Sequence, residues 1–109
     1  MELYNYRAKI TSVYDGDTCT ALVDLGFRIT FEIKIRLLGI DTPELRGEER
    51  EMGLKSKARL EELVLNKDVI IKTDKDKTEK YGRWLAEIFV DDLNVNQTLL
   101  SEGLATKYL

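Results

Sequence analysis

The chain lacks several features that would assign its class at once. It has one cysteine, Cys19, so no internal disulfide can form and the hydrophobic core must stabilise the fold. No apolar stretch approaches the length needed to span a bilayer, so we expect no membrane partner. Its first ten residues show no basic segment followed by an apolar one, the pattern of a signal peptide. The location stays open: the cytoplasm, or export after removal of a signal.

The chain also lacks an excess of positive charge. It has 17 Lys and Arg against 20 Asp and Glu, a formal net charge of −3. Tight non-specific binding to nucleic acid is therefore disfavoured, because phosphate binding normally leaves a basic footprint. The charges are unevenly spread, with glutamates concentrated at positions 48–62 and basic residues at positions 72–83. A nucleic-acid substrate is not excluded, since a bound divalent cation would offset part of the acidic excess locally.

No repeat, low-complexity tract or linker interrupts the 109 residues. A chain of this length is large enough for one modest core and too short for two. We therefore predict a single domain over residues 1–109.

The clearest structural signal is a strict alternation of apolar and polar residues over 28–37, which predicts a strand with one buried face. Residues 18–23 are rich in strand formers, and the intervening turn at 24–27 contains Gly26. The two segments predict an antiparallel hairpin, preceded by a strand over 3–13. Centring the turn on Leu25 and Gly26 predicts that Asp17 lies opposite Ile35 or Arg36.

The second half of the chain alternates between helix and strand signals. Helical spacing predicts a helix over 49–65, which Asn66 closes. Strands are predicted over 68–72 and 84–90, and a short helix over 95–102 that ends before a glycine. Three strands, a helix, two strands and a helix predict a mainly β, α+β fold: a five-stranded Greek-key barrel of the OB type with two helices.

Five polar residues carry the chemistry of the sequence. Asp17 and Asp41 offer hard oxygen ligands to a cation such as Ca²⁺. Glu44 is a further carboxylate that can activate a water molecule. Arg36 and Arg83 carry rigid donor forks that match a phosphate better than lysine does. Together these groups are what hydrolysis of a phosphodiester requires.

Hairpin geometry brings most of these residues to one end of the predicted barrel. Asp17 precedes the second strand and Asp41 follows the third, so both lie at the same end of the hairpin. The residue before Pro43 avoids the helical region, so the chain stays extended and Glu44 remains close to Asp41. Local reasoning does not place Arg83. Each motif alone has an ordinary explanation as a turn, a loop or a solvated charge, but their joint occurrence favours a shared site.

Three motifs carry a resemblance to a known family. They are Val-Tyr-Asp-Gly-Asp-Thr at 13–18, Arg-Leu-Leu-Gly-Ile-Asp-Thr-Pro-Glu at 36–44 and Glu-Lys-Tyr-Gly-Arg at 79–83. They resemble the signatures of the staphylococcal nuclease-like (thermonuclease) domains, and the resemblance runs from about Arg7 to Lys107. The fold that it implies is the OB-type barrel that the strand order also predicts.

The resemblance implies a calcium-dependent endonuclease, a phosphodiesterase that acts on DNA and/or RNA and releases products with a 3′-phosphate. Asp17 and Asp41 match the family's metal-binding carboxylates. The carbonyl of Thr42 would be a further ligand to the Ca²⁺ cofactor.

The resemblance also implies roles for the remaining polar residues. Glu44 matches the residue proposed as general base for the attacking water. Arg36 and Arg83 match the arginines that hold the phosphate and stabilise the charge of the transition state. Lys80 and Tyr81 match residues that contact the phosphates of bound nucleotide.

The sequence departs from the staphylococcal enzyme in three places. The chain ends at Leu109, so we expect the third, C-terminal helix to be absent; the surface it covers is then polar, covered by the first helix, or buried in a homodimer. The loop at 45–50 is shorter and more acidic. The aromatic residues that stack on a base have only an approximate counterpart in Tyr108.

Two alternatives to a nuclease remain. One is a nucleic-acid-binding module of nuclease-like fold without significant catalysis, which would have no need of all five polar residues together. The other is a small barrel that binds proteins. The sequence does not distinguish a DNA from an RNA substrate.

Overall fold

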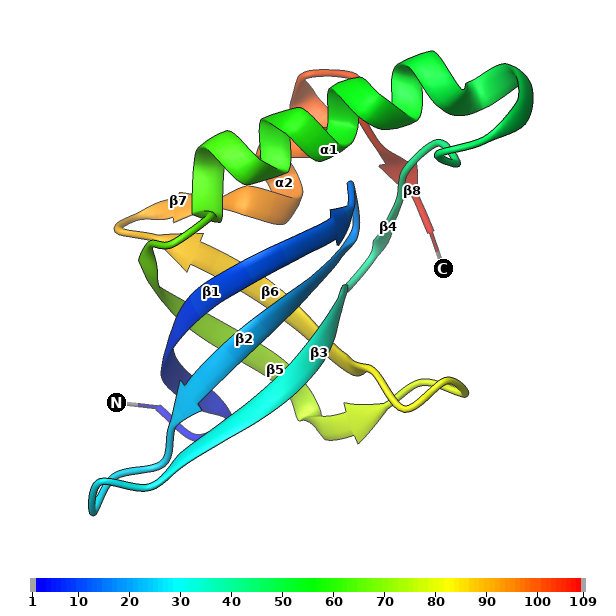
Figure 1. Cartoon of the computed structure of the whole chain (residues 1–109). Coiled ribbons are helices and arrows are strands. Elements are labelled where there is room, and N and C mark those ends of the chain that lie inside the picture. Colours follow the sequence, from blue (N-terminus) through cyan, green and yellow to red (C-terminus); the bar gives the residue numbers. More distant parts are fainter. Residues whose placement is uncertain (1, 109) are drawn as a thin grey trace.

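The barrel is formed by five strands joined edge to edge, as seen in a computed structural model that describes residues 2–108. The strands are β1 (Asn5–Asp15), β2 (Thr18–Asp24), β3 (Thr30–Leu37), β5 (Asp68–Thr78) and β6 (Trp84–Val90). Their order is β3-β2-β1-β5-β6 with antiparallel neighbours, and a parallel pairing of β3 with β6 closes the barrel (Figure 1). The predicted OB-type α+β fold is confirmed.

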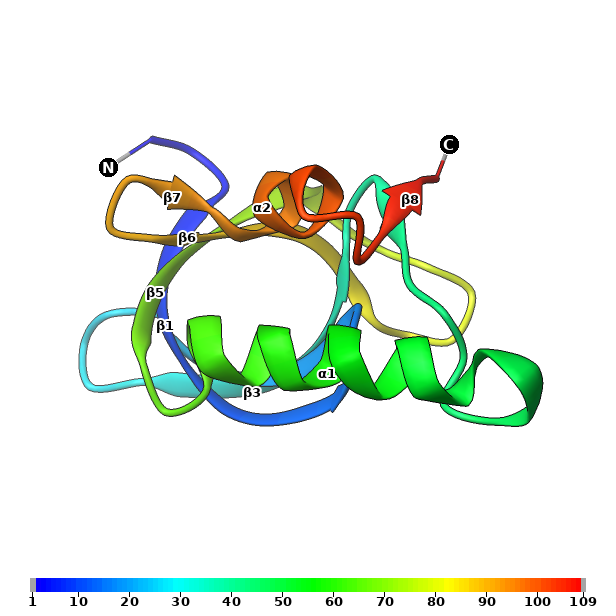
Figure 2. The ribbon, with the colours of Figure 1, turned by 90° about the horizontal axis from the view of Figure 1, so that it is seen from above.

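Two helices cover one end of this barrel. The first is α1 (Arg50–Val64), which follows a short 3₁₀ turn, η1 (Gly47–Glu49). It lies across the barrel opening, and α2 (Val95–Ser101) lies on the opposite side of the rim (Figure 2). Short strands complete the fold: β4 (Ile40–Asp41) pairs with β8 (Thr106–Lys107), and β7 (Leu93–Asn94) pairs with β6. Within residues 2–108, neither helix combines the length and apolar character that a bilayer crossing requires.

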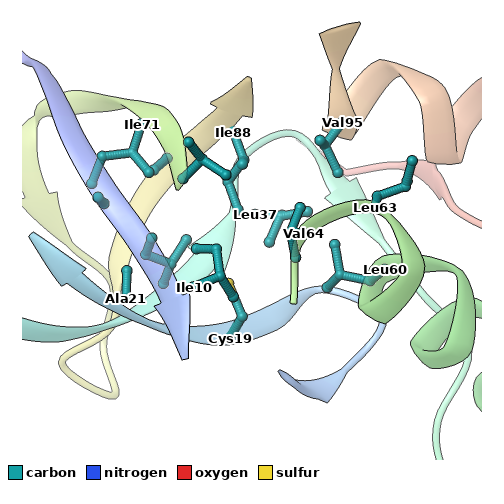
Figure 3. Close-up of a cluster of buried hydrophobic side chains, with 14 of the residues drawn as sticks. Ile10, Cys19, Ala21, Leu37, Leu60, Leu63, Val64, Ile71, Ile88 and Val95 are labelled. Atoms are coloured by element: carbon teal, nitrogen blue, oxygen red, sulfur yellow. The ribbon is translucent and has the colours of Figure 1, made fainter. Parts of the chain in front are cut away.

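The core fills the barrel and the space beneath α1. Side chains from every barrel strand meet apolar side chains of both helices there, as Figure 3 shows for Ile10, Leu37, Ile88, Leu60 and Val95. Cys19 is buried among them, and this burial raises the pKa of its thiol to about 12. A thiol held protonated in an apolar core is inert, so Cys19 serves packing and not chemistry.

The register of the β2–β3 hairpin differs from the prediction. Thr18 lies opposite Arg36, so Asp17 lies opposite Leu37, and its carbonyl accepts a hydrogen bond from the Leu37 amide at 2.8 Å. The loop is longer than a two-residue turn: the amide of Leu25 donates a hydrogen bond to the carbonyl of Ile29, which leaves three residues between them. Three consecutive residues of this loop, from Gly26 to Arg28, have positive φ angles.

Other element boundaries shift by a few residues. The predicted strand over 28–37 begins at Thr30, because residues 28 and 29 belong to the loop. The predicted strand over 68–72 continues to Thr78 beyond an irregularity in its pairing with β6. The strand over 84–90 is confirmed, and Asn66 ends the first helix with a positive φ of 60°.

A buried asparagine ties the end of β3 to β6 and α2. Asn96 is 1% exposed, and its Oδ1 accepts a hydrogen bond from the amide of Ile88 at 3.2 Å. Its Nδ2 donates to the carbonyls of Leu38 at 2.9 Å and Ala86 at 3.2 Å. Asn96 therefore fixes the point at which the chain leaves the barrel and enters the segment that contains Asp41.

We expect Asn96→Ala to lower the free energy of unfolding by about 3 kcal/mol, because it removes the partners of the Ile88 amide and the Leu38 carbonyl, whereas the Ala86 carbonyl keeps its hydrogen bond from the Leu38 amide. Gln97→Ala, one residue away on the exposed face of α2, should change it by less than about 0.5 kcal/mol. Urea denaturation of both variants measures the difference. Equal stability of the two would show that water replaces the Asn96 hydrogen bonds.

Candidate functional site

The turn between β1 and β2 supplies a buried carboxylate. Asp17 is 6% exposed, and its Oδ2 accepts a hydrogen bond from the backbone amide of Thr42 at 3.0 Å. Its Oδ1 accepts one from the hydroxyl of Thr18 at 3.2 Å. Asp17 therefore joins the first turn of the barrel to the segment that follows β4, two places separated by 25 residues.

Arg36 lies between the two aspartates. Its Nη1 is 3.4 Å from Oδ2 of Asp17, and its Nη2 is 3.3 Å from Oδ1 of Asp41. The same Nη1 donates to the carbonyls of Leu37 at 3.0 Å and Ile40 at 2.8 Å, which fixes the turn between β3 and β4. The structure thus brings Asp17, Arg36 and Asp41 together at one end of the hairpin.

The second arginine reaches the same place from the start of β6. Nη1 of Arg83 donates to the Thr18 hydroxyl at 3.2 Å, and that hydroxyl donates in turn to Asp17. The other side of the guanidinium forms two hydrogen bonds of 3.0 Å with the carboxylate of Glu79. These bonds lower the pKa of Glu79 to about 2. The position of Arg83, which sequence reasoning left open, is therefore within two hydrogen bonds of Asp17.

Lys80 and Tyr81 lie beside Arg83 at the outer edge of the site. The Tyr81 ring is 72% exposed. Nζ of Lys80 is 5.1 Å from the ring centroid, and Cζ of Arg83 is 5.4 Å from it. Both distances are in the range of cation–π contacts, so the three side chains form one group.

Glu44 is placed by its backbone. Its side chain is exposed and, within the described part of the chain, has no hydrogen bond or ion pair. Its carbonyl lies directly against Gly53 of α1; a Cβ at Gly53 would be 2.9 Å from the Pro43 carbonyl oxygen and closer still to that of Glu44. Only glycine allows the helix to approach this segment so closely.

The turn with Asp17 rests on the same helix. A Cβ at Gly16 would lie 2.7 Å from Cβ of Ser56 and 2.8 Å from Oγ1 of Thr42. Ser56 is itself buried and donates its hydroxyl to the carbonyl of Leu104 at 2.6 Å. Gly16 and Gly53 therefore let one helix hold both site segments in place.

Sequence reasoning missed two residues of this arrangement, Asp15 and Glu79, and named Tyr108 only as an approximate counterpart of base-stacking aromatic residues. Asp15 accepts a hydrogen bond from the amide of Asp17 at 3.1 Å, and burial together with the Asp17 carboxylate raises the pKa of Asp15 to about 6. Glu79 holds Arg83, and Tyr108 lies with its ring centroid 5.6 Å from Cζ of Arg36. Asp15 and Glu79 could have been found because they lie inside the motifs at 13–18 and 79–83. For Tyr108 the sequence offered only an approximate match to an aromatic position of the family.

The donor chemistry of the site fits a hard cation. Asp15, Asp17, Asp41 and the Thr42 carbonyl offer oxygen ligands only, the kind that Ca²⁺ prefers. Burial is the main cause of the raised pKa of Asp15, and the hydrogen bond and charge of Asp17 add to it. Between residues 2 and 108, no group of three or more His, Cys, Asp or Glu side chains is arranged so that it could hold a metal ion. A cation bound here would need water or substrate oxygens to complete its coordination.

Comparison with known proteins agrees with this geometry. The family model for staphylococcal nuclease homologues matches residues 34–109. The chain belongs to the staphylococcal nuclease homologue family. The match includes the second half of β3 and all of β6, and it covers Arg36, Asp41, Glu44 and Arg83.

Relatives of this nuclease homologue include proteins named as nucleases. The thermonuclease of Staphylococcus intermedius is 31% identical over 88% of this chain and 56% of its own length. Endonuclease YncB of Bacillus subtilis is 38% identical over 84% of this chain and 43% of its own length. An uncharacterized protein of Methanocaldococcus jannaschii is 35% identical over 96% of this chain and 60% of its own length. The chain thus spans about half the length of the relatives it matches.

We expect Gly53→Ala to lower the free energy of unfolding by about 1–3 kcal/mol, because the methyl group collides with the Pro43–Glu44 backbone. Helix propensity alone predicts the opposite sign, a gain of about 1 kcal/mol. Lys55→Ala, on the exposed face of the same helix, is the control and should change stability by less than about 0.5 kcal/mol. Thermal or urea unfolding measures both; a stabilised Gly53→Ala variant would contradict the close packing.

We expect Glu79→Gln to destabilise the fold at neutral pH and not in acid. Because its pKa is lowered from 4.5 to about 2, ionised Glu79 stabilises the fold above pH 4.5, and this contribution is lost as the pH falls toward about 2. The difference between the urea midpoints of wild type and variant should therefore shrink over that range. Glu32→Gln, at an exposed residue for which no ion pair is seen among residues 2–108, should show no such trend.

Proposed function

We propose that this nuclease homologue is a calcium-dependent endonuclease that hydrolyses phosphodiester bonds of DNA or RNA and leaves a 3′-phosphate. The observation that carries the proposal is the convergence of two guanidinium groups on one buried carboxylate. Arg36 lies 3.4 Å from Asp17, and Arg83 reaches it through the Thr18 hydroxyl. The names of the relatives support nuclease activity. Calcium and the 3′-phosphate rest on the resemblance of the three motifs.

The two arginines are suited to bind a phosphate that gains charge during reaction. Each guanidinium is a planar fork whose geometry matches phosphate oxygens. Glu79 holds one fork, and Asp17 and Asp41 hold the other, so both are ordered before substrate arrives. Donors ordered in advance lower the barrier most, because they need not reorganise as the charge develops.

Asp17, Asp41 and the Thr42 carbonyl are the groups that would hold the cation. When bound, Ca²⁺ supplies Lewis-acid polarisation of a phosphoryl oxygen. The same aspartates form ion pairs with Arg36, so the proposed cation site and the proposed phosphate site lie directly next to each other.

Glu44 is the proposed general base. Its exposed carboxylate accepts a proton from water as the water oxygen forms a bond to phosphorus. The bond between phosphorus and the 5′-oxygen breaks, and the 5′-oxygen departs with a proton from solvent, which leaves the phosphate on the 3′ side. Lys80 and Tyr81, next to Arg83, contact a neighbouring phosphate of the substrate.

We expect release of acid-soluble nucleotides from DNA or RNA with Ca²⁺ and not with a chelator. Glu44→Gln should lower the rate by about 100- to 10,000-fold, because it removes the proton acceptor. Glu48→Gln, a second exposed glutamate in the connection between β4 and α1, is the matched control and should retain the rate.

Three outcomes would contradict parts of the proposal. Equal activity with the chelator would exclude the calcium requirement. An unchanged rate for Glu44→Gln would remove Glu44 from the mechanism. Binding of oligonucleotides without cleavage would favour the alternative, a nucleic-acid-binding module.

A further inference from the structure

A groove leads away from the arginines along the outer face of the barrel. It has a volume of about 410 Å³ and lies over the outer surface of β1, β2 and β3. Tyr14, Thr20 and Lys34 line it, and Arg83 and Thr18 form the end that adjoins the site. We refer to it as the Tyr14–Lys34 groove. None of its outer residues belongs to the machinery proposed above.

The strand register places the groove one step from Arg36. Thr18 lies opposite Arg36, and two residues further along the strands Thr20 lies opposite Lys34. Two residues along a strand span about 7 Å and return to the same face of the sheet. Lys34 is exposed, so its ammonium group lies on the same outer face as Arg36, in the next outward row. This separation suits one nucleotide unit between two bound phosphates.

Tyr14 points outward because it follows Val13, which packs against the core, and successive side chains of a strand alternate between its two faces. Val13 lies opposite Cys19 and Asp15 opposite Thr18, so Tyr14 is an extra residue in β1. Val13 still packs against the core, whereas Tyr14 is 71% exposed. Bulges of this kind are common next to functional sites. One exposed tyrosine is unremarkable in itself, but this one lines the groove that ends at Arg83.

The charges around the groove limit how many nucleotides it can bind. Lys34 and Arg83 are the cations that line it, and the half-buried Asp15 is the last residue of β1. The next outward row of β3 is occupied by Glu32, which lies opposite Leu22 and is exposed. A phosphate is therefore favoured beside Lys34 and disfavoured beyond it. The groove therefore suits one nucleotide and not an extended stretch of nucleic acid.

We propose that the Tyr14–Lys34 groove binds the nucleotide next to the scissile phosphate of a single-stranded nucleic acid. The ring of Tyr14 stacks on the base, and Lys34 pairs with the phosphate of that nucleotide. A single strand is required because a base must leave its own stack to reach the tyrosine. The proposal rests on the proposed function, since it takes the position of the scissile phosphate from Arg36 and Arg83.

Binding measured apart from cleavage tests the groove. In the Glu44→Gln background with Ca²⁺, fluorescence anisotropy gives the affinity for a single-stranded oligonucleotide of about eight nucleotides and for a stable abasic oligomer of the same length. Tyr14→Ala should weaken binding of the base-containing strand about tenfold and leave the abasic one unchanged. Tyr14→Phe should retain the affinity because it keeps the ring. Lys34→Ala should weaken binding of both strands and reduce the salt dependence.

Phe27→Ala and Lys9→Ala are the matched controls. Phe27 is 97% exposed at the far tip of the β2–β3 hairpin, and Lys9 lies on the outer face of β1 opposite Leu22, outside the groove. Neither should change the affinity.

The outcomes separate this proposal from the proposed function. Oligonucleotide binding that Tyr14→Ala leaves unchanged, or weakens equally for the abasic strand, overturns the groove and leaves the nuclease proposal standing. A base-dependent loss with Tyr14→Ala supports the groove even where the wild type shows no cleavage. Absence of binding by every form overturns both.

Discussion

The site depends on how closely α1 approaches the two segments that carry its carboxylates. Gly16 lies against Cβ of Ser56, and Gly53 lies against the carbonyl of Glu44, so there is no room for a side chain at either glycine. Beyond the two residues of β4, the segment from Thr42 to Glu44 has no regular structure of its own. Contact with the helix and the hydrogen bond from Thr42 to Asp17 therefore replace the ladder that would normally fix its position. A shift of α1 would move both carboxylate-bearing segments.

Charge balance explains how an acidic chain can carry a phosphate site. Arg83 is paired with Glu79, and Arg36 with Asp17 and Asp41, so much of the arginine charge is neutralised before any ligand binds. The pKa values show the two sides of this balance: that of Glu79 is lowered by Arg83, whereas that of Asp15 is raised by burial and by Asp17. A cation at the aspartates would release Arg36 toward a phosphate. The net charge of −3 therefore does not exclude a nucleic-acid substrate.

The sequence predicted the barrel because its signals are local, and missed what depends on distant pairing. Alternation over 28–37 identified the inward face of β3, but the hairpin register was wrong because Phe27 and Arg28 adopt positive φ angles that no turn motif announces. Arg83 could not be placed, since its position follows from the parallel pairing of β3 with β6. The bulge that makes Tyr14 an extra residue in β1 is not revealed by composition. The convergence of Asp17, Arg36 and Asp41 followed from strand order alone and is present in the structure.

The outer face of β3 carries Arg36 of the proposed site and Lys34 of the groove. The packing of its inner face determines that these two side chains point outward. Ile33, Ile35 and Leu37 are buried in the core, which forces Lys34 and Arg36 to the opposite face. A slip of one residue in the register would send both cations into the barrel and three apolar side chains into water. The energy that prevents this slip comes from the core, at about 25 cal/mol per Å² of apolar surface buried. The face on which Arg36 and Lys34 lie is therefore determined by packing on the opposite side of the strand.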